Sequence, residues 1–465
     1  MPLIASRAAD SAFALGFGKA STFAGYSTWV TNVAVSSSYS FANTCTDSSG
    51  NTYLTIDDGT WLYVQKISTN GTIIWQKQVG TSSYVLYYAH ITLKNDDSTL
   101  YIAYLSNKYN SSNLCLEITS LNTLTGNIVS SGCAYYYSSR TFQLQSFRYS
   151  SYATNGKNLV VTLYGTIDAT YSTVYSSVVI TIDPSNFASY TISRVFLPTA
   201  SNGITAYGAT IINGGYSVVR CFHSSYGPAV QSVNNAGSPY ASQKSLGSES
   251  GWGIDGDSSG NFYTDFYTAN GKIGIQKNST EACTFVWAKE LTITGATATL
   301  LSFGSNTVYV DSTDNVYCVA TLKNGATNAY LVVFKMDSSG NVQWIKKFYT
   351  SYSQSTQGGP LFAGSITGKG SYLSVGAAFN NSSYFSTLIT LNTNGAVLDT
   401  TYTGTSDVGN LTVSTPAYTV ASVSSAGSWT GEGSDTPPTF TTASVANITS
   451  TTSSLTNVVV PLSTS

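Results

Sequence analysis

The chain has 465 residues, of which 42% are hydrophobic and only 9% are charged. This hydrophobic share suffices for a large core, although soluble domains usually carry about 25% charged residues. Twenty Lys and Arg against 22 Asp and Glu exclude the positive surplus with which proteins neutralise nucleic-acid phosphates. With two His and six Cys, little material remains for His-ligated metals or His-based catalysis. We therefore expect a β-rich, turn-rich protein without cofactors, since Ser, Thr, Gly and Tyr are abundant.

Residues 1–25 precede the repeats described below and are expected to form a docking arm. Arg7 and Asp10 interrupt the apolar run that a secretory signal requires. No apolar run in the chain reaches the roughly 18 residues that a membrane-spanning helix requires. The sequence therefore predicts neither a cleaved signal nor insertion into a membrane.

The first repeat is a hairpin pattern in which an Asp/Asn/Gly turn leads into an alternating apolar strand. Clear copies occupy residues 45–56, 256–266 and 310–320. Weaker copies occupy residues 94–104, 154–163, 212–222 and 367–377. Turn residues followed by period-two alternation predict a β-hairpin, so we expect seven such hairpins, spaced by roughly 50 residues.

A second hairpin alternates with the first and ends in a strand with the pattern W-x-K. It is clear at residues 68–79, 278–291 and 336–348, and degenerate at 122–129, 183–192, 234–243 and 392–402. Two hairpins in each period make four strands, which is typical of one blade of a β-propeller. Seven blades can close into a ring, and closure removes sheet edges that a chain with so little charge would otherwise expose.

Residues 26–403 resemble a β-propeller of the D-x-x-G-N-x-Y and W-x-K type, found in bacterial, viral and quinoprotein-like repeat proteins. This resemblance implies an all-β fold of seven four-stranded blades. Trp29 stands in the same outer-strand motif as Trp75 but has no complete blade before it, so we expect its strand to close the ring. The alternative is an eight-bladed ring that uses part of residues 404–465. This Ser/Thr-rich tail is otherwise predicted to form extended β structure outside the ring.

The strand order of a blade places its two tight hairpins on one face of the ring and the remaining connections on the other. The sequence puts Tyr in these remaining connections, where binding sites on rigid scaffolds usually lie. Tyr combines a flat apolar ring with a hydroxyl group, which suits it to contacts with sugars or proteins. Packing between blades is the alternative role for each Tyr. The candidate ligand-binding residues are Tyr84, Tyr87, Tyr88, Tyr135, Tyr136, Tyr137, Tyr171, Tyr175, Tyr226, Tyr349 and Tyr352.

Other chemical motifs are weak. Asp255 and Asp257 partly match a calcium loop but lack its terminal Glu, so the sequence predicts no metal site and leaves these two as a weak calcium candidate. Cys115 and Cys133 flank a predicted turn and either form a disulfide across it or remain two unpaired small residues. His90 lies in an apolar strand and is expected to be a hydrogen-bonded core residue.

The first twenty residues resemble the start of structural proteins of marine bacteriophages, particularly cyanophages, which also carry Ser/Thr/Tyr-rich β-repeats. This resemblance implies a non-enzymatic virion protein, a tail fibre or another appendage, whose arm contacts other virion proteins in an oligomeric assembly. Its tyrosine-bearing face would recognise a host glycan or receptor. Two alternatives stay open. One is a purely structural capsid-decoration or tail subunit, and the other is a fibre-borne enzyme that degrades polysaccharides with a pair of carboxylates.

Overall fold

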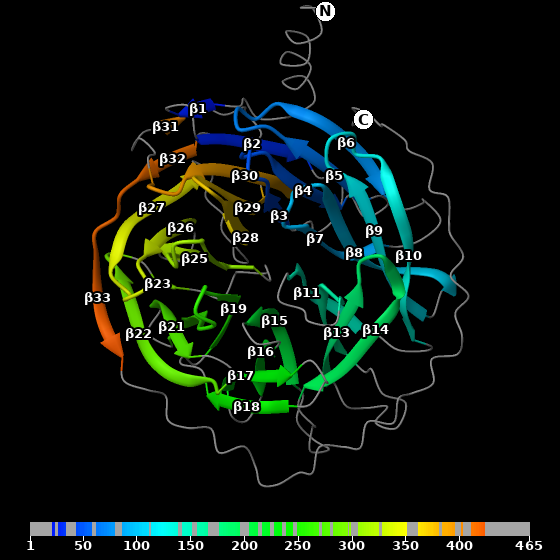
Figure 1. Ribbon diagram of the computed structural model, residues 1–465. Coiled ribbons are helices and arrows are strands. Elements are labelled where there is room, and N and C mark those ends of the chain that lie inside the picture. Colours follow the sequence, from blue (N-terminus) through cyan, green and yellow to red (C-terminus); the bar gives the residue numbers. More distant parts are fainter. Residues whose placement is uncertain are drawn as a thin grey trace, which may run out of the picture.

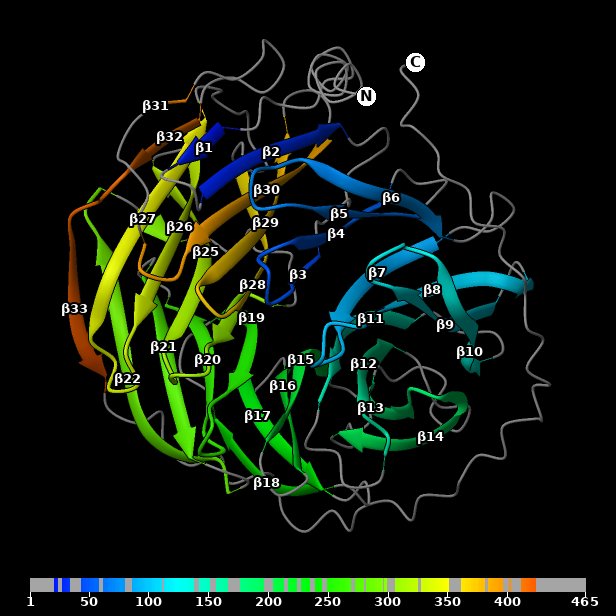
Figure 2. The ribbon, with the colours of Figure 1, turned by 45° about the horizontal axis from the view of Figure 1, so that its top comes forward.

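The structure is a computed structural model in which the strands are arranged as blades around a ring (Figures 1 and 2). It describes residues 21–23, 27–33, 43–57, 62–79, 86–110, 113–137, 142–150, 156–165, 176–195, 204–212, 216–223, 227–234, 239–244, 249–268, 272–279, 282–295, 297–298, 306–324, 328–350, 361–380, 384–395, 401–402 and 411–423. Every regular element among these residues is a β-strand. Accordingly, the described part of the chain contains no helix that could cross a membrane.

The first four blades each consist of four consecutive antiparallel strands, ordered from the axis outwards except where noted. Blade 1 contains β3 (Thr44–Thr46), β4 (Thr52–Asp57), β5 (Leu62–Ile67) and β6 (Ile73–Val79). Blade 2 contains β7 (Leu86–Leu93), β8 (Thr99–Asn110), β9 (Asn113–Asn122) and β10 (Ile128–Tyr137). Blade 3 contains β11 (Phe142–Tyr149), β12 (Leu159–Gly165), β13 (Ser176–Asp183) and β14 (Asn186–Val195). Blade 4 contains β15 (Ile204–Ile212), β16 (Tyr216–His223), β17 (Gly227–Asn234) and β18 (Pro239–Lys244).

The last three blades each gain strands from the ends of the chain. Blade 5 contains β19 (Glu249–Gly256), β20 (Phe262–Tyr267), β21 (Ile273–Ser279), β22 (Thr284–Ile293) and an outer β33 (Tyr418–Val423). Blade 6 contains β23 (Thr297–Ala298) and β24 (Val308–Val310), which both pair with β25 (Val316–Asn324), then β26 (Asn328–Met336), β27 (Val342–Thr350), β32 (Leu411–Ser414) and β31 (Thr401–Tyr402). Blade 7 contains β28 (Leu361–Lys369), β29 (Tyr372–Asn380), β30 (Tyr384–Asn392), β2 (Ser27–Val33) and β1 (Ser21–Phe23).

The inner strands of the blades contact one another in a closed cycle. The order is β3, β7, β11, β15, β19, β24, β28 and then β3 again. The sheets among the described residues number seven, which is the count that the repeats predict. The predicted all-β propeller is therefore confirmed by the strand pairing itself.

The strand around Trp29 closes the ring, as its motif predicts. β2 pairs with β30 along its length, with Trp29 opposite Ile389. It supplies the fourth strand of blade 7, so blade 7 joins strands from both ends of the propeller region. The described strands of the tail form no eighth blade, because β32 and β33 pair with the outer strands of blades 6 and 5.

The hydrophobic core lies between blades. One cluster combines Tyr53 and Val64 of blade 1 with Ile102 and Leu121 of blade 2. A larger cluster joins blades 5 and 6 in the same way. Each strand of a blade is covered on both faces by neighbouring blades, and burying one large apolar side chain contributes roughly 1.5–3 kcal/mol. The alternating pattern of the sequence therefore specifies which face of a strand meets which neighbour.

Candidate functional site

The two ends of the ring differ in the connections that they carry. We call the end with the tight turns the turn face; it includes residues 47–51 and 68–72 in blade 1. We call the other end, where second strands lead to third strands and blades lead to blades, the loop face. The turns of adjacent blades lie together, because Ser48 N donates a hydrogen bond to Asp97 Oδ2 at 2.8 Å and Ser258 N donates one to Asp314 Oδ1 at 2.9 Å.

The predicted tyrosine set falls on the loop face wherever its backbone is described. Tyr87 and Tyr88 lie at the start of β7, and β10 ends with Tyr135, Tyr136 and Tyr137. Both of these strand ends meet the loop face, because the opposite ends of β7 and β10 carry tight turns. Tyr84, Tyr171, Tyr175, Tyr226 and Tyr352 lie outside the described residues.

Tyr349 is the member of the set whose side chain is described, and it has a packing role. It lies near the end of β27 and packs, half-buried, against the cluster between blades 5 and 6. The Lys347 ammonium lies 5.0 Å from its ring centroid. Burial lowers the pKa of Lys347. The interblade alternative therefore applies to Tyr349, whose ring contributes to the stability of the scaffold.

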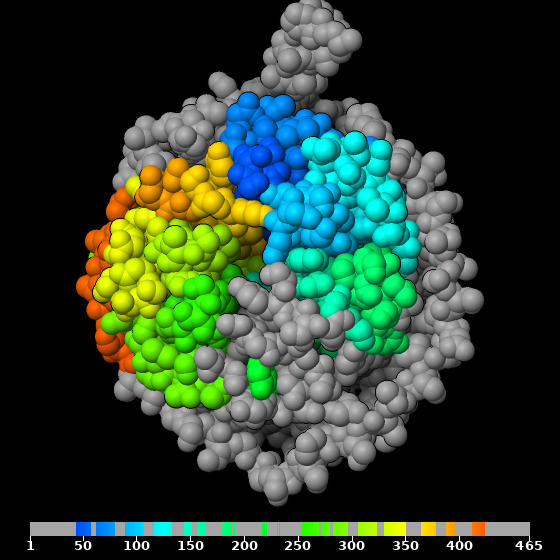
Figure 3. Space-filling model, in the orientation of Figure 1, coloured from blue at the N-terminus to red at the C-terminus, as the bar shows by residue number. Residues whose placement is uncertain are grey.

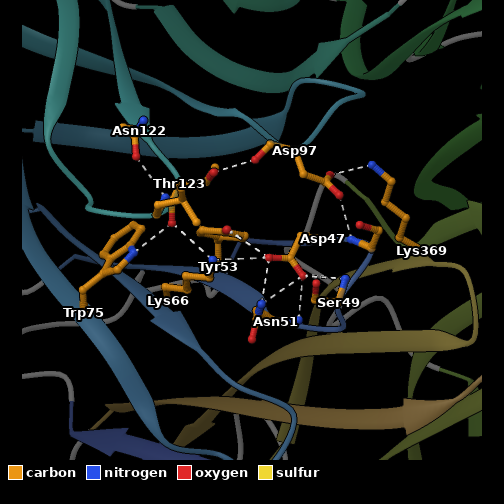
Figure 4. A network of polar contacts seen from close by, with 12 residues as sticks. Asp47, Ser49, Asn51, Tyr53, Lys66, Trp75, Asp97, Asn122, Thr123 and Lys369 are labelled. Atoms are coloured by element: carbon orange, nitrogen blue, oxygen red, sulfur yellow. Dashed lines mark hydrogen bonds and ion pairs between the residues drawn. The ribbon is translucent and has the colours of Figure 1, made fainter.

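The turn face carries a repeated polar cassette, shown for blade 1 in Figure 4. Asp47 accepts hydrogen bonds from Ser49 N and Asn51 N at 3.0 and 2.9 Å and from the Tyr53 hydroxyl at 3.1 Å. The Lys66 ammonium lies 3.5 Å from Asp47 Oδ2 and 5.1 Å from the centre of the Tyr53 ring. One buried carboxylate thus holds a turn, a tyrosine and a lysine together.

The cassette recurs in blade 5 with the same residue types. Asp257 accepts hydrogen bonds from Asn261 N at 2.8 Å and the Tyr263 hydroxyl at 3.1 Å, and the Lys277 ammonium lies 3.2 Å away. Although burial alone raises the pKa of Asp257, hydrogen bonds from Asn261 and the nearby Lys277 bring it below the ordinary value. The carboxylate therefore stays ionised in the fold.

Blade 6 repeats the turn with Asp311, Asn315 and Tyr317, whose hydroxyl donates to Asp311 Oδ2 at 2.8 Å. Its lysine, Lys335, lies 5.3 Å from the centre of the Tyr317 ring. Burial is the largest cause that raises the pKa of Tyr317, followed by its hydrogen bond to Asp311.

The Trp residues of the W-x-K strands connect each cassette to the next blade, as their repetition predicts. Trp75 Nε1 donates a hydrogen bond to the Thr123 carbonyl at 3.1 Å, and Trp344 Nε1 donates one to the Thr393 carbonyl at 3.1 Å. In blade 5, Trp287 Nε1 donates to the Ser338 carbonyl at 3.2 Å. These tryptophans therefore hold the outer strands of blades to neighbouring turns.

Two aspartates explain why some copies of the first hairpin are weak in the sequence. Asp97 and Asp314 occupy the turn position that Gly50 and Gly260 occupy in the clear copies, with positive φ angles of 58° and 62°. A non-glycine residue in this region is uncommon, and Asp is among the tolerated types. Both carboxylates accept hydrogen bonds from a neighbouring blade, so the departure from Gly supplies an interblade contact.

Lys369 extends this turn contact across three blades. It ends β28 of blade 7, and its ammonium donates to Asp97 Oδ1 at 2.5 Å and to the Asn95 carbonyl at 2.8 Å, both in blade 2. Figure 3 shows the described residues of blades 7, 1 and 2 meeting near the centre of the ring. The clear sequence motifs do not include Lys369, because the contact depends on which turns the ring brings together.

The two aspartates of the weak calcium candidate bind different protein groups. Asp255 Oδ1 accepts a hydrogen bond from Arg148 Nη1 at 2.7 Å, and its Oδ2 accepts one from Val310 N at 2.8 Å. Asp257 serves the turn cassette. Among the described residues, no group of three or more His, Cys, Asp or Glu converges on a possible metal position. Arg148 itself links blade 3 to blade 5 and, through Asn306 Oδ1 at 3.1 Å, to blade 6.

His90 is a hydrogen-bonded core residue, as expected. Its Nδ1 lies 3.1 Å from Asn43 Nδ2, and burial lowers its pKa to about 4. The expected face-to-face arrangement of Cys115 and Cys133 is wrong, because the register places Cys115 opposite Tyr136 and Cys133 opposite Glu117. A bulge next to Cys133 causes this offset, and such diagonal positions lie about 7–8 Å apart, beyond the usual reach of a disulfide.

Comparisons with known proteins bear on the course of the chain. No family model matches the sequence, and no curated protein matches it. A chain of the mitotic checkpoint complex has a TM-score of 0.46 at 9% identity and covers 78% of this chain and 90% of its own. The propeller of Dos1 has a TM-score of 0.40 at 12% identity, covering 78% of this chain and 89% of its own.

Virginiamycin B lyase from Staphylococcus aureus, in selenomethionine-substituted form, has a TM-score of 0.42 at 12% identity. It covers 78% of this chain and 99% of its own. These chains belong to proteins of unlike function, an enzyme among them, and propellers in general carry unrelated activities. The propeller assignment for this chain rests on its own strand pairing and on the closed cycle of inner strands.

Proposed function

We propose that this protein is a non-enzymatic recognition protein that binds a host glycan with its loop face. The observation that supports this proposal is the division between the two ends of the ring. The turn face is occupied by structural contacts, since Asp47, Asp257 and Asp311 bind their own turns. Tyr87, Tyr88 and the Tyr135–Tyr137 run instead lie at strand ends of the loop face.

The chemistry of these residues favours a neutral, polar ligand. Tyr rings stack against the apolar face of a sugar, and their hydroxyl groups bind its rim at a low cost in conformational entropy. The low charge of the chain favours no strongly charged partner. A virion appendage is the setting that we propose, because residues 1–20 resemble structural proteins of marine bacteriophages. The arm would then contact other virion proteins, and the loop face would be presented outwards.

The test compares two matched variants on a glycan array and in adsorption to candidate host cells. The first variant replaces Tyr135, Tyr136 and Tyr137 with Ser on the loop face. The second replaces Leu124 with Ser on the turn face, where this side chain is 80% exposed. We expect the wild type and Leu124→Ser to bind the same glycans, and the triple variant to lose roughly tenfold or more in affinity, as for loss of aromatic hot-spot residues.

Three results would contradict the proposal. The wild type binds no glycan, the two variants lose binding equally, or the wild type releases reducing ends from the glycans that it binds. The last result would favour the polysaccharide-degrading alternative. Adsorption to cells stripped of glycans would instead favour a protein receptor.

A further inference from the structure

The outer rim of the propeller consists of sheet edges, and these edges differ in protection. An exposed edge strand offers unpaired N–H and C=O groups to any other strand, and proteins usually protect it with charge, proline, a bulge or short length. The seven outermost strands among the described residues are β6, β10, β14, β18, β33, β31 and β1, one for each blade in order. They can therefore be compared directly.

Six of these edges carry a protecting feature. β6 contains Lys77, β14 contains Arg194, and β18 contains Pro239 and Lys244. β10 is interrupted by a bulge at Cys133/Tyr135. β31 and β1 are only 2 and 3 residues long.

β33 has none of these features. Its sequence, YTVASV, contains no charge and no proline, and it pairs with β22 over six consecutive residues without a register shift. Its side chains are exposed from Tyr418 to Ser422, including 36% of Tyr418 and 42% of Val420. β33 is also the outermost strand of its sheet, on the rim of the ring opposite β10 (Figures 1 and 2).

We infer that β33 pairs with β33 of a second copy of this chain and joins two propellers edge to edge. An antiparallel pair of identical strands is related by a two-fold axis, and two-fold symmetry is the commonest form of protein association. The neutral edge meets its own copy without repulsion between like charges, and its exposed Tyr418 and Val420 would be covered. Pairing would extend the five-stranded sheet of blade 5 across both copies. This inference does not depend on the proposed glycan function.

The strand direction determines how the two propellers would lie. β33 runs from the loop face, where Tyr418 pairs with Ile293, towards the turn face, where Val423 pairs with Ala288. Antiparallel pairing reverses this direction in the second copy. The two loop faces would therefore point in opposite directions, and each would stay open. A contact of one strand from each copy is small compared with the roughly 1,200–2,000 Å² of stable interfaces, so we expect association in the micromolar range.

The test measures the mass of the full chain by sedimentation over a range of concentrations, with charge variants of β33. We expect the wild type to pass from monomer to dimer and to stop there. Val420→Lys and Val420→Glu should each weaken dimerisation about tenfold or more, because like charges face each other across the two-fold axis. An equal mixture of the two variants should restore the dimer, since Lys then faces Glu.

Val286→Lys is the matched control. Val286 lies in β22 of the same sheet and is 47% exposed, but it stands beyond the residues that β33 covers. Dimerisation of this variant should equal that of the wild type. A monomeric wild type at every concentration would overturn the inference, and so would species larger than a dimer or a mixture that fails to restore association. In the first case, lower stability of Val420→Lys would indicate that the edge is covered within its own chain.

Discussion

At the scale of single residues, the buried carboxylates of the turn face stabilise the scaffold. Asp47 is 5% exposed and accepts hydrogen bonds from two backbone amides and a tyrosine, with Lys66 beside it. Asp337 makes the same turn in blade 6, where Ser339 N and Asn341 N donate to it, but it is more exposed and has no described lysine partner. The two residues therefore separate the value of the turn from the value of the buried cassette.

We expect Asp47→Ala to lower the free energy of unfolding by about 3 kcal/mol, because it leaves a buried lysine and several donors without their acceptor. Asp337→Ala should cost only about 1 kcal/mol, as for loss of a turn contact near the surface. Urea denaturation followed by tryptophan fluorescence measures both. Equal costs would show that the buried contacts to Tyr53 and Lys66 contribute nothing beyond the turn.

His90 gives the protein a specific dependence on pH. Burial lowers its pKa to about 4, whereas an unfolded chain has a histidine pKa of about 6.5. Between these values, the unfolded chain binds the proton and the folded chain does not. The free energy of unfolding is therefore greatest above pH 6.5 and falls, by about 3 kcal/mol in all, as the pH drops to 4.

His90→Gln tests this dependence, because Gln keeps an acceptor for Asn43 and does not titrate. The stability of the variant should fall less than that of the wild type between pH 7 and pH 4.5. The carboxylates contribute equally to both proteins and cancel in the difference. Parallel pH profiles would mean that His90 is protonated in the fold.

At the scale of elements, the ring depends on a strand that is distant in sequence from the blade that it completes. β2 lies between β30 and β1, so its backbone is paired on both sides. β1 pairs on one side only and is an edge. The same residue type occurs in both strands, as Thr31 and Thr22, which allows a direct comparison.

Thr31→Pro should destabilise the protein by about 3 kcal/mol, because proline in a central strand removes a ladder hydrogen bond and distorts the pairing. Thr22→Pro in the edge strand should cost less than about 1 kcal/mol, since proline is tolerated there. Thermal unfolding compares the two variants. If both lower the melting temperature equally, β2 does not act as the closing strand.

At the scale of the whole molecule, ion pairs near the axis hold together blades that are not neighbours. Arg148 of blade 3 binds Asp255 and the Ile254 carbonyl of blade 5, the latter at 2.6 Å. Lys369 links blade 7 to blade 2 on the same principle. These contacts fix the ring as one unit and support the loop face from behind.

Arg148→Met should lower stability by about 3 kcal/mol, because Asp255 then keeps a largely buried charge without its cation. The double variant Arg148→Met/Asp255→Asn should recover part of this loss, since Asn keeps an acceptor for Val310 N and carries no charge. A double-mutant cycle with urea denaturation measures the coupling. Additive costs would indicate that the two side chains do not interact across the ring.

The sequence alone determined the elements whose causes are local. Asp/Asn/Gly turns and alternating strands predict hairpins, because turn geometry and side-chain alternation depend on neighbouring residues. Their sevenfold spacing predicts the blades, and the repeated motif around Trp29 predicts a closing strand. The assignment of tyrosine-bearing connections to one face follows from strand order, and it agrees with the strand ends that carry Tyr87, Tyr88 and Tyr135–Tyr137.

The tertiary structure decided everything that depends on the meeting of distant residues. Arg148 with Asp255, Lys369 with Asp97, and the edge position of β33 have no signal in local sequence, because contacts at large sequence separation are set by ring closure. The packing role of Tyr349 and the offset of Cys115 from Cys133 likewise depend on register and neighbouring blades. Local propensity thus defines the hairpins, whereas burial and closure of the ring decide which side chains become its joints and which remain open to partners.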